Sequence, residues 1–204
     1  GMTDGVSVAT LGAAAAWTPG EVWAQEAAFL AVVVAYLAWA QWRLPAGGPP
    51  FPGPRPVGPV FKAWLVVIWL VGLLLPLVAL GVDGFWHGHA ATRLAILPYL
   101  AMFVAQVACE LWCWKRWRSP VWVIVPCLFL PWRLWQSWRG IELVEGAPLL
   151  TIATTYALFV LWLINVGVHY TNIPGTLRWD RHPPDADFRS LRDPRVFTRD
   201  AQDR

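Results

Sequence analysis

The sequence is poor in charged residues. Asp, Glu, Lys and Arg make up 14% of its 204 residues, well below the roughly 25% of an ordinary soluble domain. Hydrophobic residues make up 57%, and many of them lie in long uninterrupted runs. A soluble domain of this size could bury part of that surface but not several such runs. The composition therefore argues against a water-soluble all-helical protein and indicates an integral membrane protein.

Motifs that carry familiar chemistry are also missing. The sequence contains no phosphate-binding glycine loop, no G-x-S-x-G elbow and no H-E-x-x-H pair. It shows no inverted repeat of the transporter kind, and no run of acidic residues lines a predicted span. The cysteines, Cys109, Cys113 and Cys127, have no C-x-x-C spacing, so no disulfide framework is implied. These absences favour a non-catalytic protein over an enzyme.

Apolar runs at five places predict membrane-spanning helices. They are Glu21–Trp42, Val60–Val82, Arg93–Trp114, Val121–Trp138 and Ala147–Val168. The second run is the clearest, because about 23 residues make roughly 34 Å of helix, enough to cross a hydrocarbon layer of ~30 Å. Pro76 should kink this helix, and neighbouring groups can satisfy the carbonyl that the proline leaves free.

The fourth run is the shortest and the most polar. Val121–Trp138 makes about 27 Å of helix, a minimal span, and it contains Pro126, Pro131 and Arg133. It could cross the bilayer, or dip in and return. The predicted fold is therefore an all-α integral membrane protein with about five transmembrane helices, or four if residues 121–138 are re-entrant.

The polar segments divide the chain into three parts. Residues 1–20 form an N-terminal extramembrane segment, residues 21–168 the helical membrane domain, and residues 169–204 a polar C-terminal tail. The proline-rich loop 43–59 is predicted to be a semi-rigid spacer, with a ligand for a proline-reading domain as the alternative. The tail holds seven Arg against six Asp, so it is nearly balanced in charge. Binding to nucleic acid is not expected.

Charge placement predicts the orientation. With five spans and the N-terminus outside, 13 of the 16 basic residues lie on the inner side, which fits the positive-inside rule. Arg93, Arg133 and Arg139 are then expected on the outer side with Asp83 and Glu142. The predicted location is the plasma or photosynthetic membrane of a bacterium, with the tail cytoplasmic.

Tryptophan is unusually frequent, with 16 residues. Most of them, Trp132 included, lie near the predicted ends of spans, where indole favours the headgroup level. Trp69 and Trp162 lie deeper. An aromatic belt explains this pattern, and an aromatic pocket for a flat ligand such as a pigment, quinone or sterol is the alternative.

Polar residues inside spans are functional candidates by default. Gln106 and Glu110 share one face of the third helix through their i, i+4 spacing, and Arg133 lies in the fourth segment. Ideal helices place Arg133 about 13 Å deeper from the inner edge than Glu110. We therefore expect Glu110 to meet the basic cluster of residues 115–118 and Arg133 to snorkel outward toward Asp83 or Glu142. The alternative is a buried polar site formed by Gln106, Glu110 and Arg133.

Histidines provide weaker candidates for cofactor binding. His87 and His89 lie in a glycine-containing loop and could bind a metal, although a zinc or iron site needs three or four ligands. His169 lies near the inner end of the fifth span, where it could be an axial ligand to a chlorophyll or haem. A helix-end position at the interface is the alternative reading of His169.

Residues Phe61–Trp138 and the loop before them resemble an uncharacterised family of small multi-spanning membrane proteins of cyanobacteria and plant plastids. Four pieces carry the resemblance: GPPFPGP, VGLLLPLVALGVDGF, AQVACEL, and SPVWVIVP with Arg133 after it. It implies that Gln106 and Glu110 carry the family pattern, within the membrane of an oxygenic phototroph. Trp132 stands where the family tends to have a second arginine, and Trp122 replaces another, which weakens the case for a charged site. The family has no established activity to carry over.

Two functions follow as hypotheses. The first is a non-catalytic accessory, structural or assembly subunit of a larger membrane complex, plausibly photosynthetic, with the lipid bilayer and other membrane subunits as partners. The second is a membrane enzyme or carrier for a small hydrophobic molecule (a lipid, isoprenoid, quinone or pigment) that works through Gln106, Glu110 and Arg133. Pigment or lipid contacts are possible in either case.

Overall fold

Every regular element in the described residues, 17–43, 59–117 and 120–170 of a computed structural model, is a helix. The elements are α1 (Pro19–Arg43), α2 (Pro59–Trp69), η2 (Leu70–Leu74), α3 (Leu75–Ala79), η3 (Leu80–Trp86), α4 (Ala90–Leu111), η4 (Trp112–Arg116), η5 (Pro120–Val123), α5 (Ile124–Leu143) and α6 (Leu149–Tyr170). The elements η2, η3 and η4 are π-helical and η5 is a 3-10 turn. Most of the predicted N-terminal segment, proline-rich loop and polar tail lies outside the described residues.

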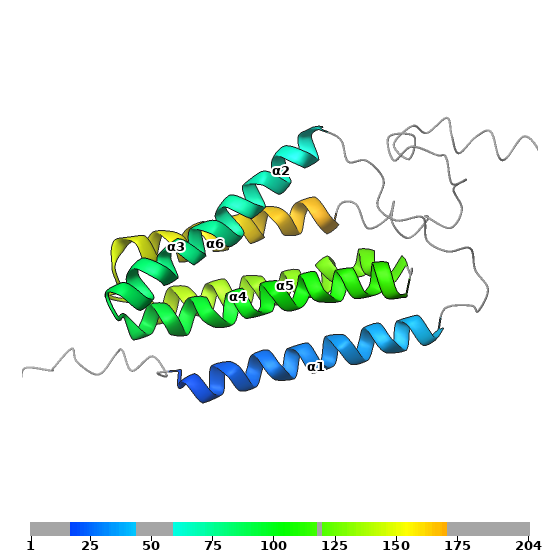
Figure 1. The fold of residues 1–204 in the computed structure, drawn as a ribbon, viewed down its shortest axis with the longest axis horizontal. Coiled ribbons are helices and arrows are strands. Elements are labelled where there is room, and N and C mark those ends of the chain that lie inside the picture. The colour runs from blue at the N-terminus through cyan, green and yellow to red at the C-terminus, as the bar shows by residue number, and fades with distance from the viewer. Residues whose placement is uncertain (1–16, 44–58, 118–119, 171–204) are drawn as a thin grey trace, which may run out of the picture.

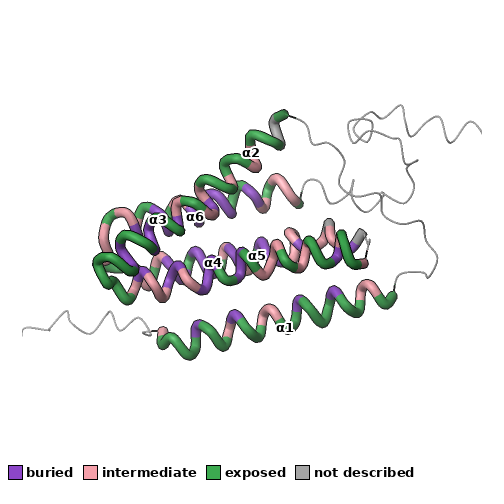
Figure 2. Tube along the Cα trace, in the orientation of Figure 1, coloured by how far each residue is buried: buried purple, intermediate pink, exposed green. Residues whose placement is uncertain are grey.

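The helices form one bundle in which successive long segments run in opposite directions (Figure 1). In this view α4 and α5 lie in the middle, α1 on one side, and α6 with α2 and α3 on the other. Buried positions are frequent on α4 and α5, whereas α1 and α2 are largely exposed (Figure 2). Four helices in the described residues are long and apolar enough to cross a membrane, Pro19–Arg43, Lys62–Trp86, Ala90–Arg116 and Leu149–Tyr170.

The start of α1 is set by a local hydrogen-bonding motif. Thr18 Oγ1 accepts a hydrogen bond from the Glu21 backbone N–H at 3.3 Å, and the Glu21 carboxylate accepts one from the Thr18 N–H at 2.9 Å. This reciprocal capping box satisfies two donors that a helix start leaves free. Pro19 fits the first helical position, because its missing N–H would be unpaired there anyway.

The second span continues as a helix through Pro76, with the π-helical turn η2 just before it. Proline has no N–H to donate to the carbonyl four residues earlier, and its ring crowds that carbonyl. The carbonyl in question belongs to Gly72, and it lies in the π-helical turn η2. Tyr99 of α4 donates its hydroxyl to the Gly72 oxygen at 2.7 Å. A neighbouring helix thus supplies the hydrogen bond that Pro76 removes.

The fourth segment is one continuous helix. Pro126 lies in the first turn of α5, where proline is tolerated. Pro131 lies inside the helix and leaves the Cys127 carbonyl free, and Tyr170 of α6 donates its hydroxyl to that oxygen at 2.9 Å. The chain does not reverse direction between residues 124 and 143, so the described geometry does not contain the dip-and-return shape of the re-entrant alternative.

Two apolar clusters hold the bundle together. The first joins η3, α4, α5 and α6 around Ile96 and Leu158, and the second joins α1, α4, η4, η5 and α5 around Val33 and Phe129. α5 contributes to both. Gly140 is buried where α5 meets α4 and α6, and a Cβ there would be in ordinary contact with Thr155 Cγ2 at 3.4 Å and the Ala95 Cβ at 4.0 Å. α4 and α5 are therefore the two helices that connect the clusters.

Replacing Gly140 with leucine should separate α5 from α4 and α6. A Cβ at this position already contacts Thr155 and Ala95, so the rest of the leucine side chain has to displace buried neighbours, and overpacking of this kind costs about 1–3 kcal/mol. We expect a lower thermal unfolding temperature for purified protein in detergent. Gly167→Leu on α6 is the matched control, since no atom lies within 4 Å of a Cβ at that position. Equal unfolding temperatures for the two variants would contradict the close packing at Gly140.

Candidate functional site

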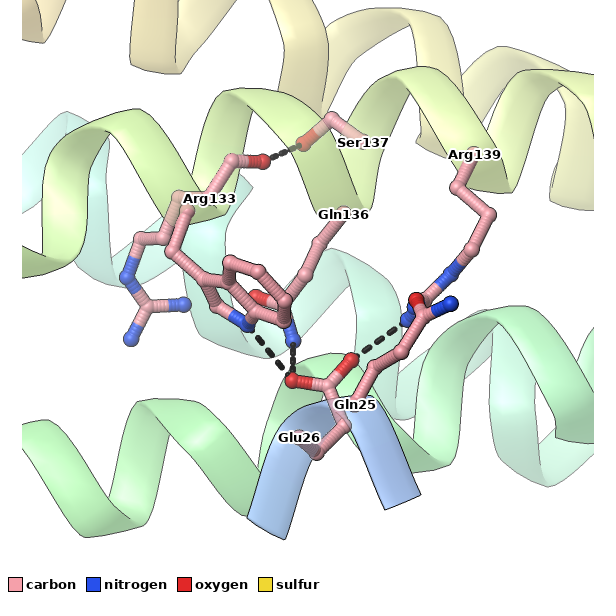
Figure 3. Close-up of polar contacts among 7 residues, drawn as sticks. Gln25, Glu26, Arg133, Gln136, Ser137 and Arg139 are labelled. Carbon is pink, nitrogen blue, oxygen red and sulfur yellow. Dashed lines mark hydrogen bonds and ion pairs between the residues drawn. The ribbon is translucent and has the colours of Figure 1, made fainter. Parts of the chain in front are cut away.

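A strip of buried polar side chains lies between α1, α4 and α5, and its centre is the Glu26 carboxylate (Figure 3). Glu26 is 2% exposed. One carboxylate oxygen accepts hydrogen bonds from Trp132 Nε1 at 2.6 Å and from Gln136 Nε2 at 2.8 Å. The other oxygen forms an ion pair with the Arg139 guanidinium, which also donates to Gln25 at 3.0 Å. All three donors to Glu26 come from α5.

Helical spacing explains how one carboxylate meets three donors. Trp132 and Gln136 are four residues apart and Arg139 follows three residues later, so their side chains share one face of α5. On α1 the same periodicity places Val22, Glu26 and Val33 on the buried face. Phe29, one turn after Glu26, stacks on the Trp132 ring with centroids 4.4 Å apart. The polar contacts therefore lie next to an aromatic contact between the same two helices.

Arg133 lies on an adjacent face of α5 and is held in a different way. It is 1% exposed. Its Nε donates to Gln106 Oε1 at 2.8 Å and its Nη2 donates to the Met102 carbonyl at 3.3 Å. The guanidinium carbon lies 4.7 to 5.2 Å from the ring centroids of three aromatic side chains, which are Tyr99, Phe103 and Trp162. Cation–π contacts of this geometry stabilise a guanidinium that has left water.

The expectation that Arg133 snorkels outward is wrong. Its side chain points into the bundle toward Gln106, whose amide nitrogen donates in turn to the Glu110 carboxylate at 2.8 Å. The depth difference is bridged because Gln106 lies one turn deeper than Glu110 and within reach of the long arginine side chain. The structure thus joins Gln106, Glu110 and Arg133 in the arrangement that the sequence offered as the alternative.

Tyr99 links this site to the second and sixth segments. Besides donating to the Gly72 carbonyl, its hydroxyl accepts a hydrogen bond from Trp162 Nε1 at 3.1 Å. The face of the same ring contacts Arg133. Tyr99 itself is 2% exposed. The aromatic cage around Arg133 is therefore fixed by hydrogen bonds as well as by packing.

A second buried acid lies at the end of the bundle near the α5–α6 turn. The Asp83 carboxylate accepts hydrogen bonds from the Thr151 N–H at 3.1 Å and from the Thr151 hydroxyl at 2.7 Å. It caps the first turn of α6 from another helix, where a negative charge is favoured. His87 contacts the other oxygen of Asp83 at 3.5 Å. Asp83 and Arg133 are therefore engaged separately, and the expected pairing of the two is also wrong.

His87 and His89 lie in the connection between η3 and α4, and His169 lies in the last turn of α6. The His87 and His89 rings lie edge to face, with centroids 6.4 Å apart. His169 makes a 3.1 Å contact with the Asn165 carbonyl of its own helix, which corresponds to the helix-end reading. In the part of the chain that the structure describes, no group of three or more His, Cys, Asp and Glu side chains could hold a metal ion.

Sequence reasoning missed the centre of the strip. The sequence predicts Arg139 on the outer side and Trp132 near the end of a span, and it does not mark Glu26 as a candidate. One signal could have identified Glu26: it falls on the face of α1 that also carries Val22, Val33 and Leu37. An acid on the packing face of an apolar helix implies a buried partner. Nothing local to Glu26 could have identified α5 as the source, because the ion pair joins residues 113 positions apart.

Comparison with known proteins finds no match among family models, curated proteins or solved structures. The resemblance of residues 61–138 to the cyanobacterial and plastid family stays a prediction. The chemistry of the site must therefore be argued from the side chains themselves. Two acids and two arginines form a balanced set in which Glu26 pairs with Arg139, and Glu110 approaches Arg133 through Gln106.

Tyr99→Phe tests whether the cage is fixed by hydrogen bonds. Phenylalanine keeps the ring beside Arg133 but removes the hydroxyl that hydrogen-bonds to the Gly72 carbonyl and the Trp162 N–H. A buried polar group that loses its hydrogen-bond partner costs about 1–3 kcal/mol. We expect a clear drop in the thermal unfolding temperature in detergent. Tyr156→Phe is the matched control, because Tyr156 is 53% exposed. If both variants unfold at the wild-type temperature, the hydroxyl of Tyr99 does not contribute to stability.

Proposed function

We propose that the chain crosses the membrane five times, with α5 as the fourth span. The alternating direction of the five long segments supports this topology (Figure 1). Arg43, Lys62, Lys115 and Arg116 lie at one end of the bundle, the end where α1 and α4 finish and α2 begins. The positive-inside rule would make that end cytoplasmic, which places the N-terminus and the α5–α6 turn outside.

Within that topology we propose a non-catalytic structural or assembly subunit of a larger membrane complex. The observation that supports this proposal is that the buried charges of Glu26 and Arg133 are held by side chains of neighbouring helices. Glu26 has three donors from α5, and Arg133 is bonded to Gln106 and Met102 and covered by three rings. Side chains committed in this way fix helices relative to one another. They suit a rigid scaffold better than a site that must bind and release a substrate.

The outer surface of α1 supports the same proposal. Trp23, Tyr36, Trp39 and Trp42 are between 38% and 75% exposed on this helix. Large exposed aromatic side chains on a membrane helix make contacts with lipid headgroups and with other membrane proteins. The partner complex, and the photosynthetic setting that the family resemblance implies, remain predictions.

A subunit should be recovered with its complex. We expect gentle solubilisation and affinity capture of the intact chain to bring down the same membrane proteins in fixed ratios, as measured by quantitative mass spectrometry of proteins, lipids and pigments. A capture from cells expressing an unrelated tagged protein with the same number of spans provides the background. Recovery of the chain as a monomer with lipid alone would contradict the proposal.

A second candidate is supported by the connection between Gln106, Glu110 and Arg133. Glu110 is less buried than Arg133, so the chain of hydrogen bonds leads from a partly exposed acid to a fully buried cation. A carrier or enzyme for a small hydrophobic molecule could bind a polar head group along this path, first at the partly exposed Glu110 and then at the buried Arg133. This candidate requires Glu110 to act through its charge.

Glu110→Gln separates the two candidates. Glutamine retains an oxygen that can accept the hydrogen bond from Gln106 but removes the charge. A carrier or enzyme should lose its cellular function while the protein remains at wild-type abundance in the membrane fraction, as measured by growth phenotype and immunoblot. Glu142→Gln, at the surface beside Trp138, is the control. A wild-type phenotype for Glu110→Gln would eliminate this second candidate.

A further inference from the structure

α5 combines two properties that conflict in a membrane protein. It carries Arg133, Arg139 and Glu142 and is not one of the four helices in the described residues that are apolar enough to cross a membrane. It nevertheless lies in the middle of the bundle, and both arginines are nearly inaccessible, at 1% and 2% exposure. A charged side chain at bilayer depth is unfavourable unless it is paired. α5 therefore needs a partner to occupy this position.

The partner for one end of α5 is α1. Glu26 neutralises Arg139 and also binds Trp132 and Gln136, so the carboxylate satisfies donors along two turns of α5. The need is mutual. Glu26 is itself a buried acid on an apolar helix, and all its hydrogen-bond donors in the described structure lie on α5. Each helix thus holds the charge that the other requires.

The partner for the middle of α5 comes from α4. Arg133 is bonded to Gln106 and lies near Glu110 through that amide. α4 also immediately precedes α5 in the chain, so this contact forms between sequential helices. The Glu26 contact is different, because α1 enters the membrane long before α5 is made. α1 must then remain available until α5 arrives.

We propose that α5 takes its place across the membrane only by pairing with α1, with Glu26 as the counter-charge that decides the insertion. Without that charge, Arg139 enters the membrane uncompensated, and α5 stays at the inner surface. The α5–α6 turn would then remain inside, and α6 would no longer start from the outer side of the membrane. The inference rests on the proposed five-span topology and assigns to Glu26 the role of a topological determinant.

Single-cysteine labelling of the full chain tests the inference. The three native cysteines are replaced by alanine, and Glu145→Cys places one thiol in the α5–α6 turn. Intact cells are treated with a membrane-impermeant maleimide, and labelling is read on protein radiolabelled for a few minutes, so that later degradation does not affect the result. Labelling is expressed relative to the same sample after permeabilisation.

The wild-type background should label from outside at residue 145, whereas Lys115→Cys should label only after permeabilisation. Glu26→Gln should reduce outside labelling at residue 145 about tenfold, because one unpaired buried charge outweighs the remaining contacts. The double variant Glu26→Gln with Arg139→Gln should restore it, because both charges are then absent. Glu21→Gln is the control on the same helix, since glutamine still closes the capping box.

Each outcome has a distinct meaning. Labelling of residues 115 and 145 from the same side in the wild-type background would refute the five-span topology itself. Opposite labelling with no effect of Glu26→Gln would leave the topology standing and overturn the role of Glu26. A loss of labelling that the double variant fails to restore would also overturn the inference, because the defect would then arise from packing and not from charge.

Discussion

The polar contact between α1 and α5 depends on the Glu26 carboxylate. A lone carboxylate in an apolar interior is strongly unfavourable, and removing one partner from a buried ion pair typically costs about 3–5 kcal/mol. Here the charge is matched by Arg139 and shared with two neutral donors on the same face of α5. Three donors from one helix fix both its rotation and its depth against α1. Arg133 is then placed on an adjacent face of α5, toward α4 and α6.

The rotation of α5 also explains the remaining polar contacts. With one face committed to α1, Arg133 meets Gln106 and the aromatic cage, and Gly140 meets Thr155. The prolines are accommodated by the same packing. Tyr99 and Tyr170 reach the carbonyls that Pro76 and Pro131 leave free, and both reach them from a neighbouring helix. Interior backbone groups are therefore satisfied between helices, as an environment without water requires.

Periodicity and run length predicted what depends on local sequence. The five helical segments and the shared face of Gln106 and Glu110 follow from residue type and spacing. The direction of Arg133 did not, because the snorkelling argument treats a charged side chain as isolated on its helix. Its amide and aromatic partners come from α4 and α6, and no local pattern records them. Glu26 was missed for the same reason, since its partners are more than 100 residues away.

α5 lies in the middle of the bundle but is not among the four helices in the described residues that are apolar enough to cross a membrane. A helix that faces lipid on one side must be apolar there, and α1 and the second segment are long and apolar enough to meet that requirement. A helix surrounded by other helices meets lipid over a smaller part of its surface, so its polar groups need protein partners and not low polarity. α5 packs against α1, α4 and α6 and carries its polar residues toward them. Its low apolarity goes with these polar partners and not with central position alone, because α4 also lies in the middle of the bundle and is apolar enough to cross a membrane.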